Sequence, residues 1–347
     1  MIRLIFPLIF LITITYTSFS FSVFYGHGLQ ASFLLSLGIF LAIRLYWRGD
    51  KSANYTLKWL GGIAMGSLSI AFFAISIAWI AKIAGASIAH IQVALSIFLP
   101  ICIALAFTLN RLAPTVRKHR LKLAHLAHPI TVVHLTDIHV NGIKPLSWFK
   151  DLVERVNTLD ADYIVFTGDF LDIPLNYMQE ILDCLKQLNA KKGKFAVSGN
   201  HDAYSGYHNF ITAMKTIDFE VIDNKVSDCK SHYFLGFPDK DCSRSGIHRV
   251  SIEELSKSLT EKKAKIVLDH RPDYFEKNSD YLHLQLSGHT HGGQLLPFNF
   301  IVRAYYRFSI GLYYFNKAII YISYGTGTWG PPMRLFGRGE IGFFELE

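Results

Sequence analysis

Long apolar runs dominate the first third of the chain. Four of them approach the ~20 residues that a helix needs to cross the ~30 Å hydrocarbon core of a bilayer, namely Leu4–Tyr25, Leu29–Trp47, Trp59–Ile80 and Ile91–Leu109. An apolar run can also be a buried core helix, but Asp50 is the only acidic residue before Asp137. Consecutive runs with so little acidic charge favour membrane helices. We therefore expect an all-α transmembrane region of about four helices in residues 1–110.

Lysine and arginine are distributed unevenly around these runs. The first connection has neither, the third has only Lys82, and the second connection and the segment after the fourth run hold Arg44, Arg48, Lys51, Lys58, Arg111, Arg117, Lys118, Arg120 and Lys122. Because basic connections stay on the cytoplasmic side, we expect a multi-pass protein of the cell (inner) membrane with a cytoplasmic carboxy-terminal domain. The first run follows Arg3 and is alternatively a signal peptide, which would leave the orientation of the other three unchanged.

From Thr131 onward, short β-rich apolar runs alternate with stretches of helical periodicity. The expected strands are Thr131–Thr136, Tyr163–Thr167, Lys194–Ser198, Glu220–Asp223, His232–Gly236, Lys265–Leu268, His283–Leu286 and Ala318–Ser323, and the expected helices are Leu146–Leu159, Tyr177–Leu188 and Phe210–Ile217. Such alternation is typical of an α/β domain with a largely parallel sheet core. We assign residues 131–347 to this domain and residues 111–130 to a basic juxtamembrane linker.

Charge and cysteine content change this picture little. A net charge of +8 would suit a nucleic-acid-binding protein, but much of the excess lies beside the apolar runs, where it serves topology and attraction to anionic lipid. We expect no nucleic-acid partner. The four cysteines, Cys102, Cys184, Cys229 and Cys242, show no paired spacing of the zinc or redox type, and we expect free thiols.

Polar residues stand where five of the expected strands stop. The segments in question are Thr136-Asp137-Ile138-His139, Gly168-Asp169-Phe170-Leu171-Asp172, Gly199-Asn200-His201-Asp202, Asp269-His270, and Gly288-His289-Thr290-His291-Gly292-Gly293-Gln294. Ligand sites in open α/β sheets assemble at the carboxyl ends of strands, so we expect these segments to converge on one crevice.

The residue types in these segments indicate metal binding. Asp137 and His139, two positions apart, project to the same side, and His289 and His291 repeat the arrangement. Imidazole and carboxylate together suit ions such as Zn, Mn, Fe or Ni. Each motif alone is weak, since a Gly-Asp pair is usually a turn, but turn chemistry does not explain all of them in this order.

The ordered motifs D-x-H, G-D-x-x-D, G-N-H-D, an isolated histidine and G-H-T-H resemble those of the calcineurin-like metallophosphoesterases. The resemblance covers Thr131 to the carboxy terminus and is closest to the membrane-anchored bacterial branch in which the last motif is G-H-T-H-G-G-Q and the isolated histidine stands in His270-Arg271-Pro272-Asp273. It implies a four-layer αββα sandwich. It also implies two divalent or trivalent metal ions, one held by Asp137, His139, Asp169 and His291 and the other by Asp169, Asn200, His270 and His289.

The resemblance assigns further roles. Asp169 would bridge two ions ~3.5–4 Å apart, an arrangement that stabilises both ends of an in-line displacement. His201 would touch the phosphate and protonate the leaving oxygen. Asp202 and Asp172 would orient the ligands. We expect no metal role for seven further histidines that match no motif position: His125, His128, His134, His208, His232, His248 and His283.

Two segments after the last motif leave alternatives open. Leu295–Phe315 is rich in aromatics, with Arg303 and Arg307 interleaved, and is either a hairpin packed on the sheet or an apolar rim for a lipid-bearing substrate. Tyr324–Gly330 is rich in glycine, but no helix pattern or lysine follows, so it is not a nucleotide-phosphate loop. The resemblance implies a strand end and a turn beside the site.

These observations favour a membrane-bound metal-dependent phosphohydrolase that cleaves a phosphoester or pyrophosphate bond. Its position at a bilayer favours a phosphorylated, lipid-linked substrate, and similar enzymes act on UDP-2,3-diacylglucosamine in lipid A biosynthesis. Three alternatives remain: a general phosphodiesterase or phosphatase, a catalytically silent binding or regulatory module, and a sensor or transporter whose function lies in the spans. His90, near the end of a run, is the only ionisable group near mid-membrane, which gives the last alternative no support.

Overall fold

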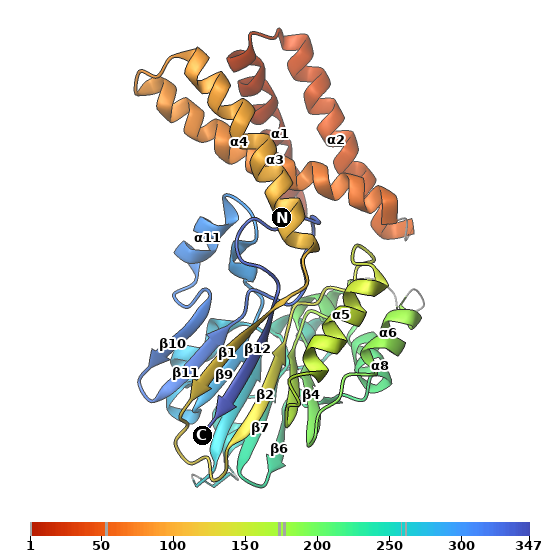
Figure 1. Cartoon of the computed structure of the whole chain (residues 1–347), viewed down its shortest axis with the longest axis vertical. Helices are drawn as coiled ribbons and strands as arrows, with labels where there is room; N and C mark the ends of the chain where they lie inside the picture. Colours follow the sequence, from red (N-terminus) through yellow and green to blue (C-terminus); the bar gives the residue numbers. More distant parts are fainter. Residues whose placement is uncertain (1, 53–54, 173–174, 176–177, 258, 261) are drawn as a thin grey trace. The chain divides into compact units, whose positions relative to one another are not determined.

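The computed structural model describes the chain except for residues 1, 53–54, 173–174, 176–177, 258 and 261. The described chain divides into two compact units. The helical unit comprises residues 1–111, 293–301 and 330–336, and the sheet unit comprises residues 112–292, 302–329 and 337–347. Figure 1 shows the elements of both units, which are described separately below.

The apolar runs form helices, as expected. The helical unit contains α1 (Ile2–Tyr25), α2 (Leu29–Ser52), α3 (Tyr55–Ile83) and α4 (Ile88–Arg111). Three stretches are long and apolar enough to cross a membrane, namely Leu29–Tyr46, Tyr55–Ile83 and Ile88–Arg111. For α1, the apolar stretch described with its side chains is shorter, Leu11–Tyr25. The structure therefore contains four amino-terminal helices, of which three qualify as candidate spans.

Aromatic and polar contacts hold the four helices together. The ring of Phe24 on α1 packs against Trp79 on α3, with their centroids 5.0 Å apart. The Tyr25 hydroxyl lies 2.7 Å from the Ser96 hydroxyl on α4. Between α2 and α3, Gly61 lies so close to the backbone of Tyr46 that a Cβ at this position would overlap it. Small residues allow this close approach of helix backbones where no hydrophobic effect drives association.

Two six-stranded sheets form the sheet unit. The first has the order β1-β12-β2-β3-β4-β5 and the second β10-β11-β9-β8-β7-β6. The strands of the first are β1 (Thr115–Leu121), β2 (Ile130–Leu135), β3 (Tyr163–Thr167), β4 (Gly193–Val197), β5 (Glu220–Val221) and β12 (Glu340–Leu346). Those of the second are β6 (Lys225–Cys229), β7 (His232–Phe237), β8 (Ala264–Asp269), β9 (Leu284–Ser287), β10 (Gly311–Phe315) and β11 (Ala318–Ile322).

Parallel pairing dominates the interior of both sheets. Strands β2 to β5 run parallel to one another, as do β7, β8, β9 and β11. Antiparallel pairs join β12 to β2, β6 to β7 and β10 to β11. The predicted parallel core with antiparallel additions is thereby confirmed, and the carboxyl ends of the parallel strands of each sheet lie along one edge.

Helices cover the outer faces of the two sheets. The first sheet is covered by α5 (Leu146–Asn157), α6 (Gln179–Leu185) and α8 (Tyr207–Thr216) (Figure 1). Side chains from α9 (Ile252–Ser256) and α10 (Phe275–Asn278) join the core on the outer face of the second sheet. The helix pattern predicted for Leu146–Leu159 is confirmed, because its apolar stripe is buried. The architecture is the expected four-layer αββα sandwich.

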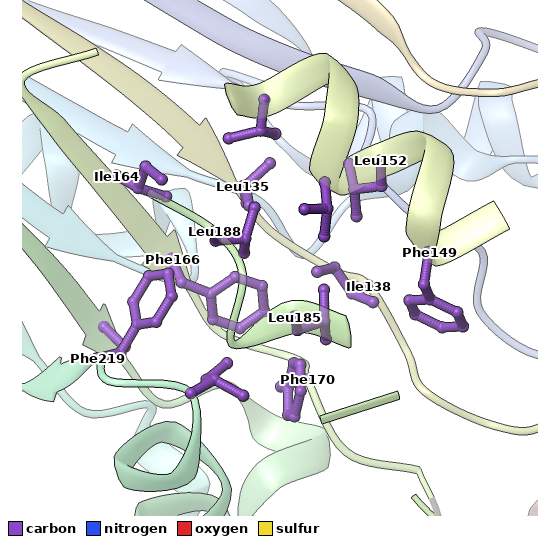
Figure 2. Close-up of a cluster of buried hydrophobic side chains, with 14 of the residues drawn as sticks. Leu135, Ile138, Phe149, Leu152, Ile164, Phe166, Phe170, Leu185, Leu188 and Phe219 are labelled. Carbon is purple, nitrogen blue, oxygen red and sulfur yellow. The ribbon is translucent and has the colours of Figure 1, made fainter. Parts of the chain in front are cut away.

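The side chains of β3 alternate between two hydrophobic layers. Ile164 and Phe166 face the helices (Figure 2), whereas Tyr163 and Val165 face the second sheet. This period of two follows from the pleat of a strand. A strand buried on both faces therefore has a continuous apolar sequence, which explains why Tyr163–Thr167 could be recognised as a central strand.

Two expectations need correction, and a third falls partly outside the described residues. Residues 111–130, expected to be a linker, contain strand β1, which pairs in parallel with β12, so that Thr115 lies opposite Glu340. Leu295–Phe315 is not a simple hairpin, because it begins with helix α11 (Phe298–Tyr305) before β10 pairs with β11. The helix predicted to begin at Tyr177, which lies outside the described residues, is described from Gln179 as α6.

Candidate dinuclear metal centre

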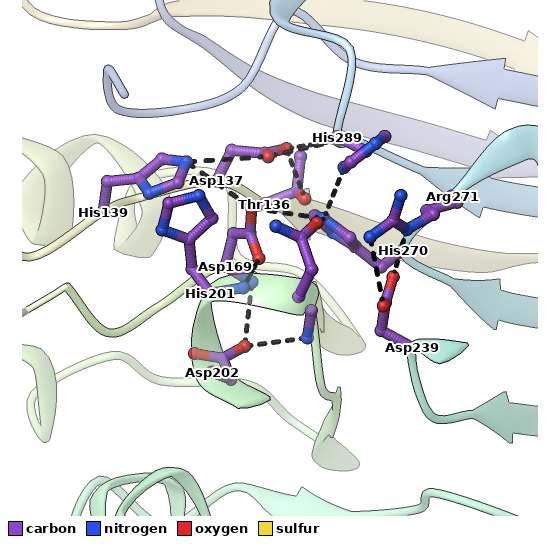
Figure 3. Close-up of polar contacts among 12 residues, drawn as sticks. Thr136, Asp137, His139, Asp169, His201, Asp202, Asp239, His270, Arg271 and His289 are labelled. Atoms are coloured by element: carbon purple, nitrogen blue, oxygen red, sulfur yellow. Dashed lines mark hydrogen bonds and ion pairs between the residues drawn. The ribbon is translucent and has the colours of Figure 1, made fainter. Parts of the chain in front are cut away.

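The expected ligands come together at the carboxyl ends of five strands. Figure 3 shows Asp137, His139, Asp169, His270 and His289 among them. The segment after β2 provides Asp137 and His139, and the segment after β3 provides Asp169. The remaining donors follow β4, β8 and β9 and are Asn200, His270, His289 and His291. The strand-end rule therefore located the site within the sheet unit.

The backbone at the ligands is unusual. Positive φ angles occur at Asp137 (53°), His139 (49°), Asp169 (58°), His289 (69°) and His291 (50°). Residues with a Cβ rarely adopt this left-handed conformation, and where they do so together the surrounding structure must enforce it. Such clustering is typical of a functional site.

One group of donors surrounds a first position. The Nε2 atoms of His139 and His291 lie 3.0 Å apart. Asp137 Oδ1 lies 3.3 Å from His291 Nε2 and 3.9 Å from His139 Nε2. Asp169 Oδ2 lies 3.7 Å from His139 Nε2.

A second group shares Asp169. Its Oδ2 lies 3.3 Å from His270 Nε2, which is 3.2 Å from Asn200 Oδ1 and 3.2 Å from His289 Nδ1. Donor atoms that lie about 2.1 Å from one ion are about 3.0–3.4 Å from each other in octahedral or tetrahedral geometry. The spacings of 3.0–3.3 Å in both groups and the donor chemistry fit metal ions. The 3.7 and 3.9 Å spacings around His139 are wider than this range.

Hydrogen bonds orient two of the ligand histidines, His270 and His139, so that Nε2 faces the donor groups. The Thr167 carbonyl lies 2.8 Å from His270 Nδ1, and Asp172 Oδ1 lies 3.1 Å from His139 Nδ1. Each acceptor favours the tautomer that is protonated on Nδ1 and leaves the Nε2 lone pair for a metal. The position of Asp172 beside His139 Nδ1 is consistent with the orienting role that the family resemblance implies.

Asp202 organises the backbone of two ligand segments. Its buried carboxylate accepts four backbone N–H groups, from Gly199 (2.8 Å) and from Asp169, Phe170 and Leu171 (2.9 Å each). Burial and the nearby Asp169 raise the pKa of Asp202 to about 7, although the Gly199 and Leu171 N–H groups lower it. Asp202 is not itself one of the expected metal ligands. It holds the turns that carry the ligands Asp169 and Asn200.

The buried carboxylates of the site, Asp137 and Asp169, need positive charge beside them. Burial raises the pKa of Asp137, whereas His270 and His201 outweigh burial and lower the pKa of Asp169 well below its ordinary value. Burial alone would lower the pKa of His270, but Asp169 raises it to about 10. Buried carboxylates are stable only beside positive charge. Bound cations would supply that charge and displace the His270 proton.

His201 stands at the edge of the donor groups. Its Nδ1 lies 2.7 Å from Asp172 Oδ1, and its partly exposed ring is 4.8 Å from that of His139. Burial lowers the pKa of His201, but Asp169 and Asp172 raise it to about 9. A protonated imidazole with its Nδ1 occupied can donate from Nε2, which suits the role of a general acid.

Glycines permit close approach at two points. A Cβ on Gly168, whose φ is +88°, would lie 2.8 Å from His270 Nδ1. A Cβ on Gly325 would lie 2.9 Å from His291 Nδ1 and 3.0 Å from Asp137 Cβ. Gly325 belongs to the glycine-rich segment Tyr324–Gly330, which confirms the prediction of a turn after a strand end beside the site.

An arginine network next to the site was missed from the sequence. Arg271 follows the ligand His270, and its Nε donates to Asp239 Oδ2 (2.6 Å) (Figure 3). Its Nη2 donates to Asp241 Oδ2 (2.9 Å). Asp239 stands two residues after β7. The strand-end rule that located the ligands could also have located Asp239.

The histidines outside the motifs lie elsewhere. Among the residues that the structure describes, no candidate metal cluster contains any of them. His134 Nε2 lies 2.7 Å from Thr167 Oγ1, the ring of His232 packs on Tyr163, and His283 Nδ1 accepts from the Lys265 N–H. These three side chains pack or hydrogen-bond within the sheet unit.

The fold and the donor chemistry together define the class of protein. Two packed sheets carry aspartate, histidine and asparagine at their strand ends, in two groups that share one carboxylate, as a metallophosphoesterase requires. The profile of the calcineurin-like phosphoesterase family matches residues 130–293. The chain belongs to this family.

Relatives support the assignment. An uncharacterized metallophosphoesterase of Bacillus subtilis, YkuE, is 31% identical over 66% of this chain and 84% of its own length. One of Helicobacter pylori is 29% identical over 67% of this chain and 64% of its own length. A cattle protein named as a transmembrane protein with a metallophosphoesterase domain is 27% identical over 84% of this chain and 67% of its own length. The match thus spans just under two thirds of the Helicobacter relative.

Proposed function

We propose that this chain is a phosphohydrolase with a dinuclear metal centre that acts on a membrane-associated phosphoester or pyrophosphate. The observation that carries the proposal is the complete donor set, in two groups that share Asp169. The first ion would be held by Asp137, His139, Asp169 and His291, and the second by Asp169, Asn200, His270 and His289. A catalytically silent module would not need to retain all of these donors.

The metal ions, Asp172 and His201 would have different roles in the proposed hydrolysis. When bound, a pair of cations would polarise the phosphoryl group and activate a water. Asp172 Oδ1 lies beside the Nδ1 atoms of both His139 and His201. The His201 ring therefore presents its Nε2 towards the phosphoryl group of the substrate. As a bond forms from the water oxygen to phosphorus and the phosphorus bond to the leaving oxygen breaks, His201 gives its Nε2 proton to that oxygen.

Three candidate spans support a membrane-associated substrate. The helical unit also includes residues 293–301 and 330–336, which belong to the phosphoesterase part of the sequence. Gly293 follows the ligand His291 by two residues. The distribution of lysine and arginine supports a cytoplasmic active site at the inner membrane. We propose UDP-2,3-diacylglucosamine as the first specific substrate to examine, with other nucleoside-diphosphate lipids beside it.

The test uses the full chain, purified in detergent, loaded with Mn, Fe, Zn or Ni and returned to vesicles. Turnover of bis(p-nitrophenyl) phosphate measures hydrolysis of a soluble phosphodiester. Turnover of nucleoside-diphosphate lipids, compared with it, measures the preference for membrane-bound substrates. A higher kcat/KM for the lipids supports the proposal. Equal or better turnover of soluble esters would identify a general phosphodiesterase, and no turnover with any ion would refute the enzymatic assignment. Cysteine accessibility after α4 gives the orientation independently.

A further inference from the structure

Helix α11 exposes an unusual amount of apolar surface for eight residues. The exposed fractions are 51% for Phe298, 54% for Phe300 and 54% for Ile301. Adjacent exposed side chains of this size mark an interaction surface more often than isolated ones do.

Within the helical unit, the segment that begins α11 is seated on α3. The Ser69 hydroxyl of α3 donates to the Leu296 carbonyl, and the rings of Phe73 and Phe300 stack with their centroids 5.7 Å apart. Leu295 belongs to a buried cluster that includes Ile70 of α3. Residues 293–301 are thereby attached to a candidate membrane span.

Residues 330–336 occupy the same face of α3. A Cβ on Gly62 would lie 2.6 Å from Pro332 Cδ, and one on Gly66 would lie 2.6 Å from Met333 Sδ. Gln294 ties the two segments together, because its Nε2 donates to the Met333 carbonyl (3.0 Å) and its own carbonyl accepts from the Leu335 N–H (2.9 Å).

The face of α3 that carries these contacts continues into exposed apolar surface. The contact positions Gly62, Gly66, Ser69 and Phe73 follow a spacing of three and four, and the next positions of that stripe are Ile77 and Ile80. These two isoleucines are 49% and 63% exposed. On a candidate span, exposed isoleucines face hydrocarbon. The apolar surface of α11 is therefore continuous with a lipid-facing surface.

We propose that Phe298, Phe300 and Ile301 of α11 insert among the acyl chains of the bilayer, so that the segment directly after the metal-ligand motif is a membrane-bound part of the phosphoesterase. The proposal deepens the proposed function and rests on it for the membrane location. It commits to bilayer lipid as the partner because α11 contacts Phe73, and the stripe of α3 that carries Phe73 continues to the exposed Ile77 and Ile80.

The experiment measures the surroundings of α11 without any substrate. Single cysteines replace Phe298 and Ile301 in full-length protein from which the four native cysteines have been removed, and each carries a nitroxide in proteoliposomes. Labels at two reference positions calibrate the accessibility to the two collision reagents. Ile80, exposed on α3, represents lipid. Lys191, a half-exposed residue in the loop before β4, represents water. Collision rates with oxygen and with nickel ethylenediaminediacetate distinguish lipid from water.

The proposal predicts that labels at 298 and 301 behave as the label at 80 does, with high oxygen and low nickel accessibility. Nickel accessibility equal to that at 191 would refute it. A Phe298→Gln/Ile301→Gln double variant should lose about tenfold or more in kcat/KM for a vesicle-borne nucleoside-diphosphate lipid and keep its turnover of bis(p-nitrophenyl) phosphate. Tyr314→Gln, at an aromatic on β10 that is 69% exposed, is the control and should change neither.

The outcomes separate the two proposals. Lipid-like labels with no phosphohydrolase activity would uphold the insertion of α11 and refute the proposed function. Water-like labels with normal turnover of soluble esters would refute the insertion and leave the metal chemistry standing. An equal loss of turnover on soluble and lipid substrates in the double variant would also contradict the lipid role, since it would show a general structural effect.

Discussion

Asp202→Asn removes one of the two oxygens that hold the ligand segments. In the native site Oδ2 accepts the N–H groups of Asp169 and Gly199, and Oδ1 accepts those of Phe170 and Leu171. An asparagine of the same shape keeps one acceptor oxygen and turns an NH2 group towards the other two donors. Two buried N–H groups then lose their acceptor, at about 1–3 kcal/mol each, so we expect a destabilisation of about 2–6 kcal/mol.

The same change should weaken metal binding, because Asp169 and Asn200 are carried by the two segments that Asp202 joins. Loss of an orienting group of this kind typically costs 10–100-fold in metal affinity. Thermal unfolding of the detergent-solubilised chain measures the stability, and titration with a chromophoric chelator measures the affinity. Both quantities should fall together.

Asp162→Asn is the matched control. Asp162 also accepts a backbone N–H, that of Thr131 at 3.0 Å, but at the beginning of β2 and β3. Its asparagine can keep that bond and loses only a half-exposed pair with Lys192, which is worth about 0–1 kcal/mol. If Asp202→Asn matched this control in unfolding and in metal affinity, Asp202 would not organise the ligand segments.

Three further predictions concern single groups. His201→Gln should keep both ions and lose turnover mainly on substrates with poor leaving groups, because such groups need a proton; metal analysis beside a series of aryl phosphodiesters tests this, and uniform loss across the series would contradict it. Burial lowers the pKa of His232 to about 4, so the unfolded chain takes up a proton near pH 6.5 that the folded chain resists. Folding stability is then lost as the pH falls from about 6.5 towards 4. In denaturation experiments, His232→Phe should remove on the order of 2 kcal/mol of the loss between pH 7.5 and 5. Stability profiles against pH that run parallel for the variant and the unaltered chain would refute this. Asp239→Asn should destabilise by roughly 3 kcal/mol, because the mostly buried Arg271 loses its closest partner, and adding Arg271→Met should recover part of the loss; an unchanged unfolding midpoint in the single variant would show that the pair is not needed.

The position of the site could be predicted because it depends on residue types at strand ends. Apolar runs such as Tyr163–Thr167 identified buried strands, and each Asp, Asn or His followed at the carboxyl end of such a run. The convergence of five ends is a property of parallel sheets. The hydrogen-bond partners of the ligand histidines could be predicted only in part. The partner of His270 Nδ1 is the backbone carbonyl of Thr167, and a backbone group leaves no signal in the residue types.

Two parts of the fold could not be predicted. Strand β1 is a basic segment without an apolar run, and its partner β12 lies more than two hundred residues further along the chain. The Ser69 hydroxyl and the Leu296 carbonyl are 227 residues apart in sequence, and hydropathy contains no information on such a pair. The positive φ angles of Asp137 and His291 are likewise imposed by the assembled site and not by local preference.

The metal content of the purified full chain tests the central claim most directly. After loading and removal of loosely bound ions, mass spectrometry of the elements should find roughly two ions per chain, as a two-metal site requires. Asp169→Asn should hold less than one ion and lose turnover with it, because its carboxylate belongs to both donor groups. Asp160→Asn, at an exposed aspartate, should match the unaltered chain. An Asp169→Asn variant that keeps both ions and its turnover, or an unaltered chain that binds none, would contradict the account.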